Sequence, residues 1–249
     1  MPDYPYFSCS RIQTFLKCPK AFEFSYVLGI EEEYETIEKY MGSAVHELFE
    51  WLYLEMAENR NHDDREIRER YDTIWNRFDI GAARIVKKGL SADDYGSLGL
   101  DMALKYVTRV IRNDSGATLY LEHQFDCDLG EGIVYRGIID RISRTAEGLL
   151  RLTDYKTGRS VPDPEKDLQL RSYALAMFDT YPDDRIEICY EDLRQERSLQ
   201  RIVDRSHCPV ISEELKRAVV EILKADRFPA SPSSLCDWCG HLPHCSEGK

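Results

Sequence analysis

Two aspartates and a lysine stand out because they interrupt segments that are otherwise apolar. Asp140 lies in the run YRGIIDRIS, and Asp154 and Lys156 lie in LTDYKTG. Residues two apart on a β-strand point to the same side, so we expect the Asp154 and Lys156 side chains to face the same way. If the two strands pair across the turn at Glu147-Gly148, Asp140 comes close to Asp154. The prediction is two carboxylates and an ammonium at one point of a sheet.

Such a group suits a divalent cation. Two neighbouring carboxylates repel each other unless a cation lies between them. Oxygen ligands that leave positions open for water and phosphate favour Mg²⁺ or Mn²⁺. A lysine beside the cation could orient or deprotonate a water molecule and stabilise charge that develops on a phosphate. The alternative interpretation is a surface salt bridge between Asp154 and Lys156, because D-x-K is a short pattern.

A second set of possible metal ligands lies in CDWCGHLPHC, residues 236–245. It contains Cys236, Cys239 and Cys245, and Cys18 in FLKCPKAF is the best candidate for a fourth thiolate. Four thiolates form a complete set of soft ligands. They would join the two ends of the chain.

Zinc is the alternative for this site, with His241 or His244 in place of one cysteine. Cys127, Cys189 and Cys208 lie singly in or beside apolar stretches and are predicted to be buried thiols. The segment MPDYPYFSCS lacks the features of a signal peptide, so we expect reduced cysteines and metal binding rather than disulfides.

Composition indicates a soluble globular protein, since 43% of the 249 residues are hydrophobic and 31% are charged. No apolar run approaches the ~18 residues of a membrane span, so we expect a cytoplasmic protein without membrane association. The formal net charge of −12 argues against indiscriminate nucleic-acid binding. Residues 133–160 are nevertheless locally basic, which suits a phosphate backbone; the alternative for Arg141 and Arg151 is an ordinary solvent-facing position.

The periodicity of the apolar residues predicts an α/β protein. Alternating segments predict strands, and apolar residues at helical spacing predict helices. The strands are expected over 118–129, 132–143, 149–157, 185–192 and 198–204, and the helices over 8–27, 36–58, 64–80, 93–113, 163–180 and 211–226.

Four short motifs follow one another in an order that resembles the PD-(D/E)XK nuclease superfamily, and within it the RecB-like nucleases. The first lies in GSAVHELFEWL, where His46 and Glu50 share a helix face, and the last is QLRSY. The matching residues are Gly42 and His46, Gly137-Ile138-Ile139-Asp140, Asp154-Tyr155-Lys156, and Gln169 with Tyr173.

The resemblance implies a restriction-endonuclease-like core, with a central mixed sheet flanked by helices. It implies that His46, Asp140, Asp154 and the carbonyl of Tyr155 hold Mn²⁺ or Mg²⁺, the nitrogen ligand favouring Mn²⁺. Lys156 would assist the attacking water.

Contacts with the substrate strand are expected from Gln169 and Tyr173, and from Arg136 and Arg159 of the basic segment. Glu122, on the first strand, is either an additional acidic member of the site or an exposed strand residue.

An upstream cysteine followed by a C-terminal C-x-x-C-x5-C is similar to the iron–sulfur branch of this family, which includes CRISPR-associated spacer-acquisition nucleases and AddB-type nucleases. The resemblance implies a structural [4Fe–4S] cluster on Cys18, Cys236, Cys239 and Cys245. A single nuclease domain over 1–249 is expected. It consists of a clasp (1–30 and 228–249), a helical region carrying His46 (31–117), a catalytic sheet core (118–205) and a C-terminal helix (206–227).

The predicted function is a metal-dependent DNA exonuclease that acts on single strands or DNA ends in CRISPR adaptation or DNA repair. No G-x-x-x-x-G-K-[ST] motif occurs in the sequence, so any helicase must be a partner, as could be CRISPR adaptation proteins. The alternative is a catalytically silent nucleic-acid-binding module within a larger complex.

Overall fold

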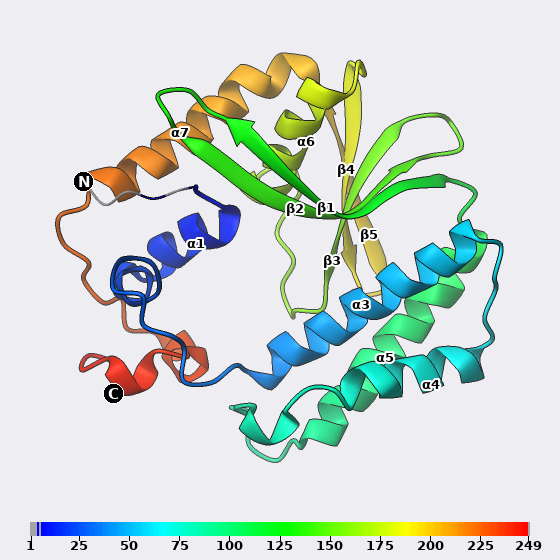
Figure 1. Ribbon diagram of the computed structural model, residues 1–249, viewed down its shortest axis with the longest axis horizontal. Helices are drawn as coiled ribbons and strands as arrows, with labels where there is room; N and C mark the ends of the chain where they lie inside the picture. The colour runs from blue at the N-terminus through cyan, green and yellow to red at the C-terminus, as the bar shows by residue number, and fades with distance from the viewer. Residues whose placement is uncertain (1–3, 5, 249) are drawn as a thin grey trace.

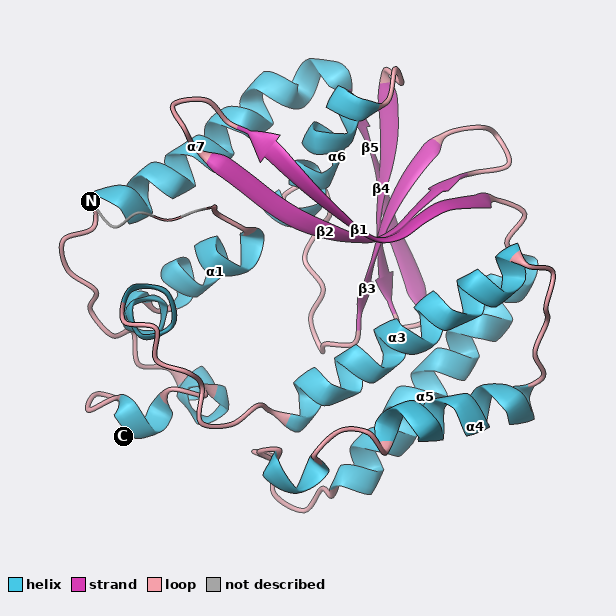
Figure 2. Ribbon diagram, viewed as in Figure 1, coloured by secondary structure: helices cyan, strands magenta, loops and turns pink. Residues whose placement is uncertain are grey.

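A mixed five-stranded sheet flanked by helices forms the centre of the molecule (Figure 1; Figure 2). The computed structural model describes residue 4 and residues 6–248. Residues 1–3, 5 and 249, which the predicted clasp includes, lie outside the described part. The strands are β1 Ala117–Asp128, β2 Val134–Arg144, β3 Leu150–Lys156, β4 Arg185–Asp192 and β5 Arg197–Asp204. The helices are α1 Cys9–Lys17, α2 Pro19–Phe22, α3 Ile37–Ala57, α4 Asp64–Trp75, α5 Ala92–Arg109, α6 Leu168–Thr180 and α7 Cys208–Lys224.

The strands lie in the order β1-β2-β3-β4-β5. β1–β2, β2–β3 and β4–β5 are antiparallel, whereas β3 and β4 are parallel, with α6 as the crossover between them. The predicted α/β fold and the antiparallel pairing of the two acidic strands are therefore confirmed.

The sheet splits between β2 and β3. Their ladder contains only the pairs from Arg144↔Leu150 to Arg141↔Thr153. Beyond it β2 stays paired with β1 and β3 with β4, and Figure 2 shows β1 and β2 running away from β3. Asp140 and Asp154 are the first residues past the end of the ladder. We call this place the fork.

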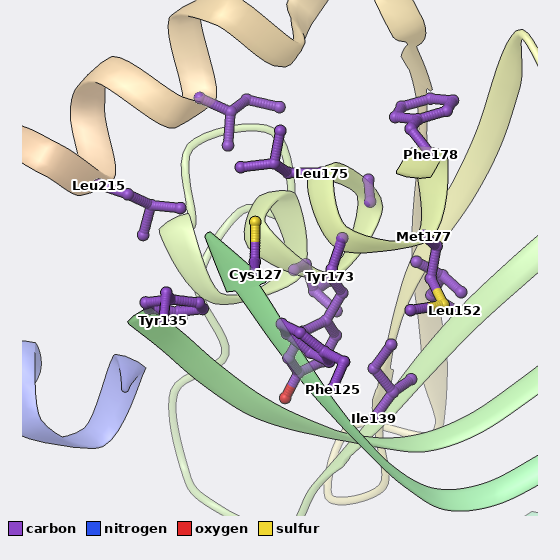
Figure 3. Packing of buried hydrophobic residues seen from close by; sticks show 14 of the residues in the cluster. Phe125, Cys127, Tyr135, Ile139, Leu152, Tyr173, Leu175, Met177, Phe178 and Leu215 are labelled. Atoms are coloured by element: carbon purple, nitrogen blue, oxygen red, sulfur yellow. The ribbon is translucent and has the colours of Figure 1, made fainter. Parts of the chain in front are cut away.

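Separate hydrophobic clusters cover the two faces of the sheet. α3, α4 and α5 pack together on one face, around buried side chains that include Phe49 and Tyr155 (Figure 1). α6 and α7 cover the other face, where Phe125, Ile139 and Tyr173 are buried (Figure 3). The fork consequently lies between α3 on one face of the sheet and α6 on the other.

Five predicted helices have different bounds in the structure. Two of them are α5, which ends at Arg109 rather than at 113, and α7, which begins at Cys208 rather than at 211 and ends at Lys224 rather than at 226. The helix expected over 8–27 is divided, because Pro19 forces Cys18 into an extended conformation; a π-helical turn, Glu23–Val27, follows α2. α4 ends at Trp75 rather than at 80. α6 begins at Leu168 rather than at 163, because Asp167 caps it through the backbone N–H of Gln169.

The prediction of a locally basic surface over residues 133–160 is wrong, because carboxylates neutralise most of its arginines. Arg141 is only 3% exposed and contacts Asp114, which also excludes the solvent-facing alternative for that residue. Arg136 pairs with Asp126. The two remaining pairs are Arg144 with Asp183 and Arg151 with Glu187.

Residues 20–33, near the start of the chain, contact residues 229–241, near its end (Figure 1). The backbone N–H of Lys20 donates to the carbonyl of Pro229 at 3.2 Å, and the N–H of Glu33 donates to the carbonyl of Gly240 at 3.1 Å. The Ser25 hydroxyl lies 2.7 Å from Nε2 of His241. Within residues 4 and 6–248, no helix combines the length and apolar character that crossing a bilayer requires.

We expect Gly137→Ala to destabilise the fold by about 1–3 kcal/mol, because a Cβ at this position would lie 2.5 Å from the buried Phe125 ring. Chemical denaturation measures the effect as a lower midpoint. Gly158→Ala is the matched control, since the nearest atom to its Cβ would be 3.9 Å away. Equal midpoints for the two variants would contradict the prediction.

Candidate metal site at the fork

α3 delivers His46 to one side of the fork. Its Nε2 lies 3.0 Å from the carbonyl oxygen of Tyr155, and its Nδ1 lies 3.4 Å from Oδ2 of Asp140. Oδ2 of Asp140 also accepts a hydrogen bond from the backbone N–H of Tyr155 at 2.8 Å. Gly42, one turn earlier in α3, allows the close approach of the segment that follows β3, because a Cβ there would lie 3.3 Å from Oγ1 of Thr157.

Glu122 completes a group of three possible metal ligands. His46, Glu122 and Asp140 each offer one ligand atom, and these atoms lie within 4.8 Å of one another. The Glu122 backbone has a φ of 45°, an unusual conformation for a residue other than glycine. Its side chain is exposed, as one of the two interpretations expected, but it faces this group and lines the same open pocket as Glu50.

Asp154 belongs to a polar network on the other side of the fork. Its Oδ1 lies 2.7 Å from Nζ of Lys156. Its Oδ2 accepts hydrogen bonds from Nε2 of Gln169 at 2.9 Å and from the Tyr173 hydroxyl at 3.3 Å. Lys156 also donates to Oε1 of Gln169 at 3.1 Å. Lys156, predicted to assist the attacking water, and Gln169 and Tyr173, predicted to contact the substrate, thus all contact Asp154, which was predicted to be a metal ligand.

The start of α6 positions this network. Asp167 accepts a hydrogen bond from the backbone N–H of Gln169 at 2.7 Å and one from the Tyr190 hydroxyl at 2.8 Å. The aromatic ring of Tyr190, on β4, also lies 4.9 Å from the Lys156 ammonium. Through Tyr190, β4 thereby contacts both the start of α6, which carries Gln169, and Lys156.

Crowding of the acidic groups changes their titration. Burial and the neighbouring Asp154 raise the pKa of Asp140 well above its usual value. Desolvation and Asp140 raise the pKa of Glu122 to about 7. Burial alone would lower the pKa of Lys156, but Asp154 and Asp140 raise it above its usual value. The group therefore attracts positive charge, and Lys156 is a cation at neutral pH.

The two arginines predicted to contact substrate lie in different places. Arg136 lines a pocket together with Gln169 and Tyr173, while its Nε and Nη2 donate to Asp126 at 2.7 Å each. Arg159 is exposed in the loop that follows β3, and the structure does not bring it together with the other predicted residues.

The four cysteines of the predicted clasp line one pocket, together with His241. Sγ of Cys18 accepts a hydrogen bond from the backbone N–H of Ser231 at 3.5 Å. A tetrahedral zinc site with bonds of about 2.3 Å would hold its sulfur atoms roughly 3.8 Å apart. No three of these thiols and histidines lie within 4.8 Å of one another, as judged from the described residues.

The prediction that Cys127, Cys189 and Cys208 are buried thiols is confirmed in part. Cys127 and Cys189 are buried, and burial raises the pKa of both thiols. Cys208 is only partly buried, at the start of α7.

Comparison with known proteins identifies the family. The model of the PD-(D/E)XK nuclease superfamily matches residues 6–246. The chain belongs to this superfamily. A solved structure designated SSO0001 aligns with the whole chain and with 89% of its own, at 16% identity and a TM-score of 0.41.

The chain is also similar to parts of longer proteins, which are named as subunits of an ATP-dependent helicase/deoxyribonuclease. The one from Streptococcus agalactiae serotype Ia is 28% identical over 167 residues, which are 64% of this chain and 15% of that protein. The protein of the same name from Ruminiclostridium cellulolyticum is 29% identical over 206 residues, 70% of this chain and 17% of that protein. The chain therefore spans less than a fifth of the length of these relatives.

We expect Mn²⁺ to stabilise the protein more at about pH 8 than at about pH 5.5. The pKa of Glu122 is raised from 4.5 to about 7 in the folded state. Between pH 4.5 and about pH 7 the metal-free folded state therefore holds a proton on Glu122 that the unfolded state has already lost. Its stability accordingly falls as the pH rises through this window, and a cation that replaces the proton restores it.

The measurement is the increase of Tm on addition of Mn²⁺ at each pH, with EDTA as reference. Glu122→Gln is the control and should show a smaller difference between the two pH values. Equal increases at both pH values in the unmodified protein would contradict the expectation.

Proposed function

We propose that the protein is a Mn²⁺- or Mg²⁺-dependent DNA nuclease whose active site lies at the fork. The observation that carries the proposal is the convergence of His46, Glu122 and Asp140 beside the contact between Asp154 and Lys156. Membership of a nuclease superfamily supports it independently.

The donor set fits a divalent cation. His46, Asp140 and Glu122 already lie around one point, and the Tyr155 carbonyl contacts His46. Oδ1 of Asp154 has Lys156 as its only polar contact among the described residues, so this oxygen is the one that can turn towards a cation. When bound, the cation supplies Lewis acidity, which lowers the pKa of water and offsets phosphate charge.

Lys156 acts as a positioned cation in this proposal. Its raised pKa makes it unsuitable as a general base, so its role is to donate hydrogen bonds to the phosphate oxygens as negative charge develops on them. Gln169 holds Lys156 and Asp154 at the same time. Gln169 and Tyr173 are proposed to contact the substrate strand, and the support is that both line one pocket.

Substrate mode and partners follow from the family resemblance. We propose exonucleolytic action on single-stranded DNA or DNA ends, in CRISPR adaptation or in DNA repair. The similar proteins are named helicase/deoxyribonuclease subunits. We propose that a helicase supplies the single strands, since this sequence has no G-x-x-x-x-G-K-[ST] motif of its own.

We further propose a [4Fe–4S] cluster on Cys18, Cys236, Cys239 and Cys245. The support is that these four thiols line one pocket, and four thiolates form a complete set of soft ligands for such a cluster. His244 is a poor substitute ligand because its Nε2 lies 3.2 Å from Oε1 of Glu33. The cluster would join the segment around Cys18 to the segment 236–245 and so stabilise the fold.

Replacement of Lys156 by alanine is expected to lower the rate of DNA cleavage about 10²- to 10³-fold, the range found when a donor to a developing oxyanion is removed. The assay follows end-labelled single-stranded and duplex DNA with Mn²⁺, Mg²⁺ or EDTA. Lys105→Ala is the matched control, because Lys105 pairs with Asp101 and Glu196 away from the fork. Binding of DNA without cleavage in either metal would instead favour the catalytically silent module.

Protein purified without oxygen is expected to show the broad visible absorbance of an iron–sulfur cluster and to contain iron and sulfide. Cys239→Ser should abolish the absorbance and lower Tm, whereas Cys208→Ser, outside the pocket, should leave both unchanged. A colourless protein that contains one zinc ion would refute the cluster.

A further inference from the structure

The segment preceding α1 covers an edge that the fork leaves open. Beyond the ladder with β3, the backbone of β2 is free on one side, and Phe7 pairs with it there. The N–H of Phe7 donates to the Val134 carbonyl at 2.8 Å, and the N–H of Arg136 donates to the Phe7 carbonyl at 2.7 Å. The Phe7 side chain is 3% exposed. Residues 6–11 are thus anchored beside the proposed active site.

A pocket separates this segment from α6. It is lined by Tyr6, Ser8 and Ser10 from the N-terminal segment, by Ile138 from β2, and by Gln169 and Tyr173 from α6. Since Gln169 and Tyr173 both bond to Asp154, the pocket adjoins the fork. Ile138 is 48% exposed, which leaves an apolar surface in a pocket of hydroxyl groups.

Two guanidinium groups lie over the ring of Tyr6. Cζ of Arg11 is 4.1 Å from the ring centroid, and Cζ of Arg136 is 4.6 Å from it. Arg11 also donates to the Tyr6 carbonyl at 2.6 Å and lies over the Tyr26 ring at 4.9 Å. Aromatic contacts of this kind hold a guanidinium without neutralising it.

The charges on Arg11 and Arg136 are held differently in the described part of the chain. Arg136 donates hydrogen bonds to Asp126 through Nε and Nη2, and its Nη1 takes no part in this pair. Arg11, by contrast, forms no ion pair with any carboxylate in the described part of the chain. In a protein with a formal net charge of −12, an arginine that is held by two aromatic rings and pairs with no described carboxylate favours an anionic ligand.

We propose that this pocket binds the nucleotide next to the scissile phosphate of a single DNA strand. Arg11 is not part of the lining, but its guanidinium lies over the ring of the lining residue Tyr6. From there Arg11 contacts the phosphate together with the Ser8 and Ser10 hydroxyls, and the sugar or base lies on Ile138. Guanidinium and hydroxyl groups suit phosphate oxygens, and exposed apolar or aromatic surface suits an unpaired base. The assignment rests on the proposed nuclease function and extends it, because it gives the strand a path from the fork towards the N-terminal segment.

The test is binding of a fluorescent single-stranded oligonucleotide in Ca²⁺, followed by anisotropy over a range of salt concentrations. Arg11→Gln is expected to weaken binding about five- to tenfold and to reduce the salt slope by about 0.7, the value for one phosphate contact on a single strand. Arg65→Gln is the matched control, since Arg65 is exposed on α4 and lies 3.7 Å from Glu69. It should bind as the unmodified protein does.

A second variant separates binding from folding. Ser10 is exposed in the first turn of α1, where a negative charge stabilises the helix. Ser10→Glu should therefore preserve or raise Tm while it weakens DNA binding at least fivefold. If Arg11→Gln loses both binding and Tm while Ser10→Glu binds normally, the loss of binding is due to impaired folding. That result would overturn the proposal.

Cleavage by the unmodified protein is measured in parallel. If DNA binds in an Arg11-dependent manner but is not cut with Mn²⁺ or Mg²⁺, the nuclease function fails and the nucleotide pocket stands. If DNA is cut and Arg11→Gln and Ser10→Glu both bind as the Arg65→Gln control does, the pocket fails and the nuclease function stands.

Discussion

Repulsion between Asp140 and Asp154 is the constraint on which the arrangement of the site depends. Two carboxylates at the end of one ladder are unstable together unless charge or hydrogen bonds compensate them. The fold separates their partners: Asp140 accepts from the Tyr155 backbone on the α3 side, and Asp154 accepts from Gln169 and contacts Lys156 on the α6 side. The remaining excess of negative charge on the α3 side is what makes the fork a site for a cation.

The fork also explains why helices from both faces of the sheet are needed. α3 brings a nitrogen ligand to one side, and α6 brings an amide and a phenol to the other. Each helix is fixed by contacts away from the site, α6 through the bond between Asp167 and Tyr190, and α3 through the cluster that surrounds Phe49. Removing either helix would expose a buried apolar face of the split sheet.

Local patterns predicted the strands well because alternation and turn residues act over a few residues. The proximity of Asp140 and Asp154 followed from the register of a short turn. Glu122 was uncertain because alternation assigns it to one face of β1 but does not reveal that α3 approaches that face. Arg141 was misjudged for the same reason, since its partners Tyr53 and Asp114 come from segments distant in sequence.

The joining of the two chain ends has a consequence for biosynthesis. The partners of Cys18 and Ser25 lie 213 and 216 residues further along the chain. At about 5–20 residues per second, a ribosome needs roughly 10 to 40 s to make that interval. Over this period Cys18 remains a free thiol, because the segments that contact it have not yet been translated. The contacts that hold the first helices therefore form only after the segment 229–241 has been translated. During this interval a chaperone that acts on nascent chains could bind those helices.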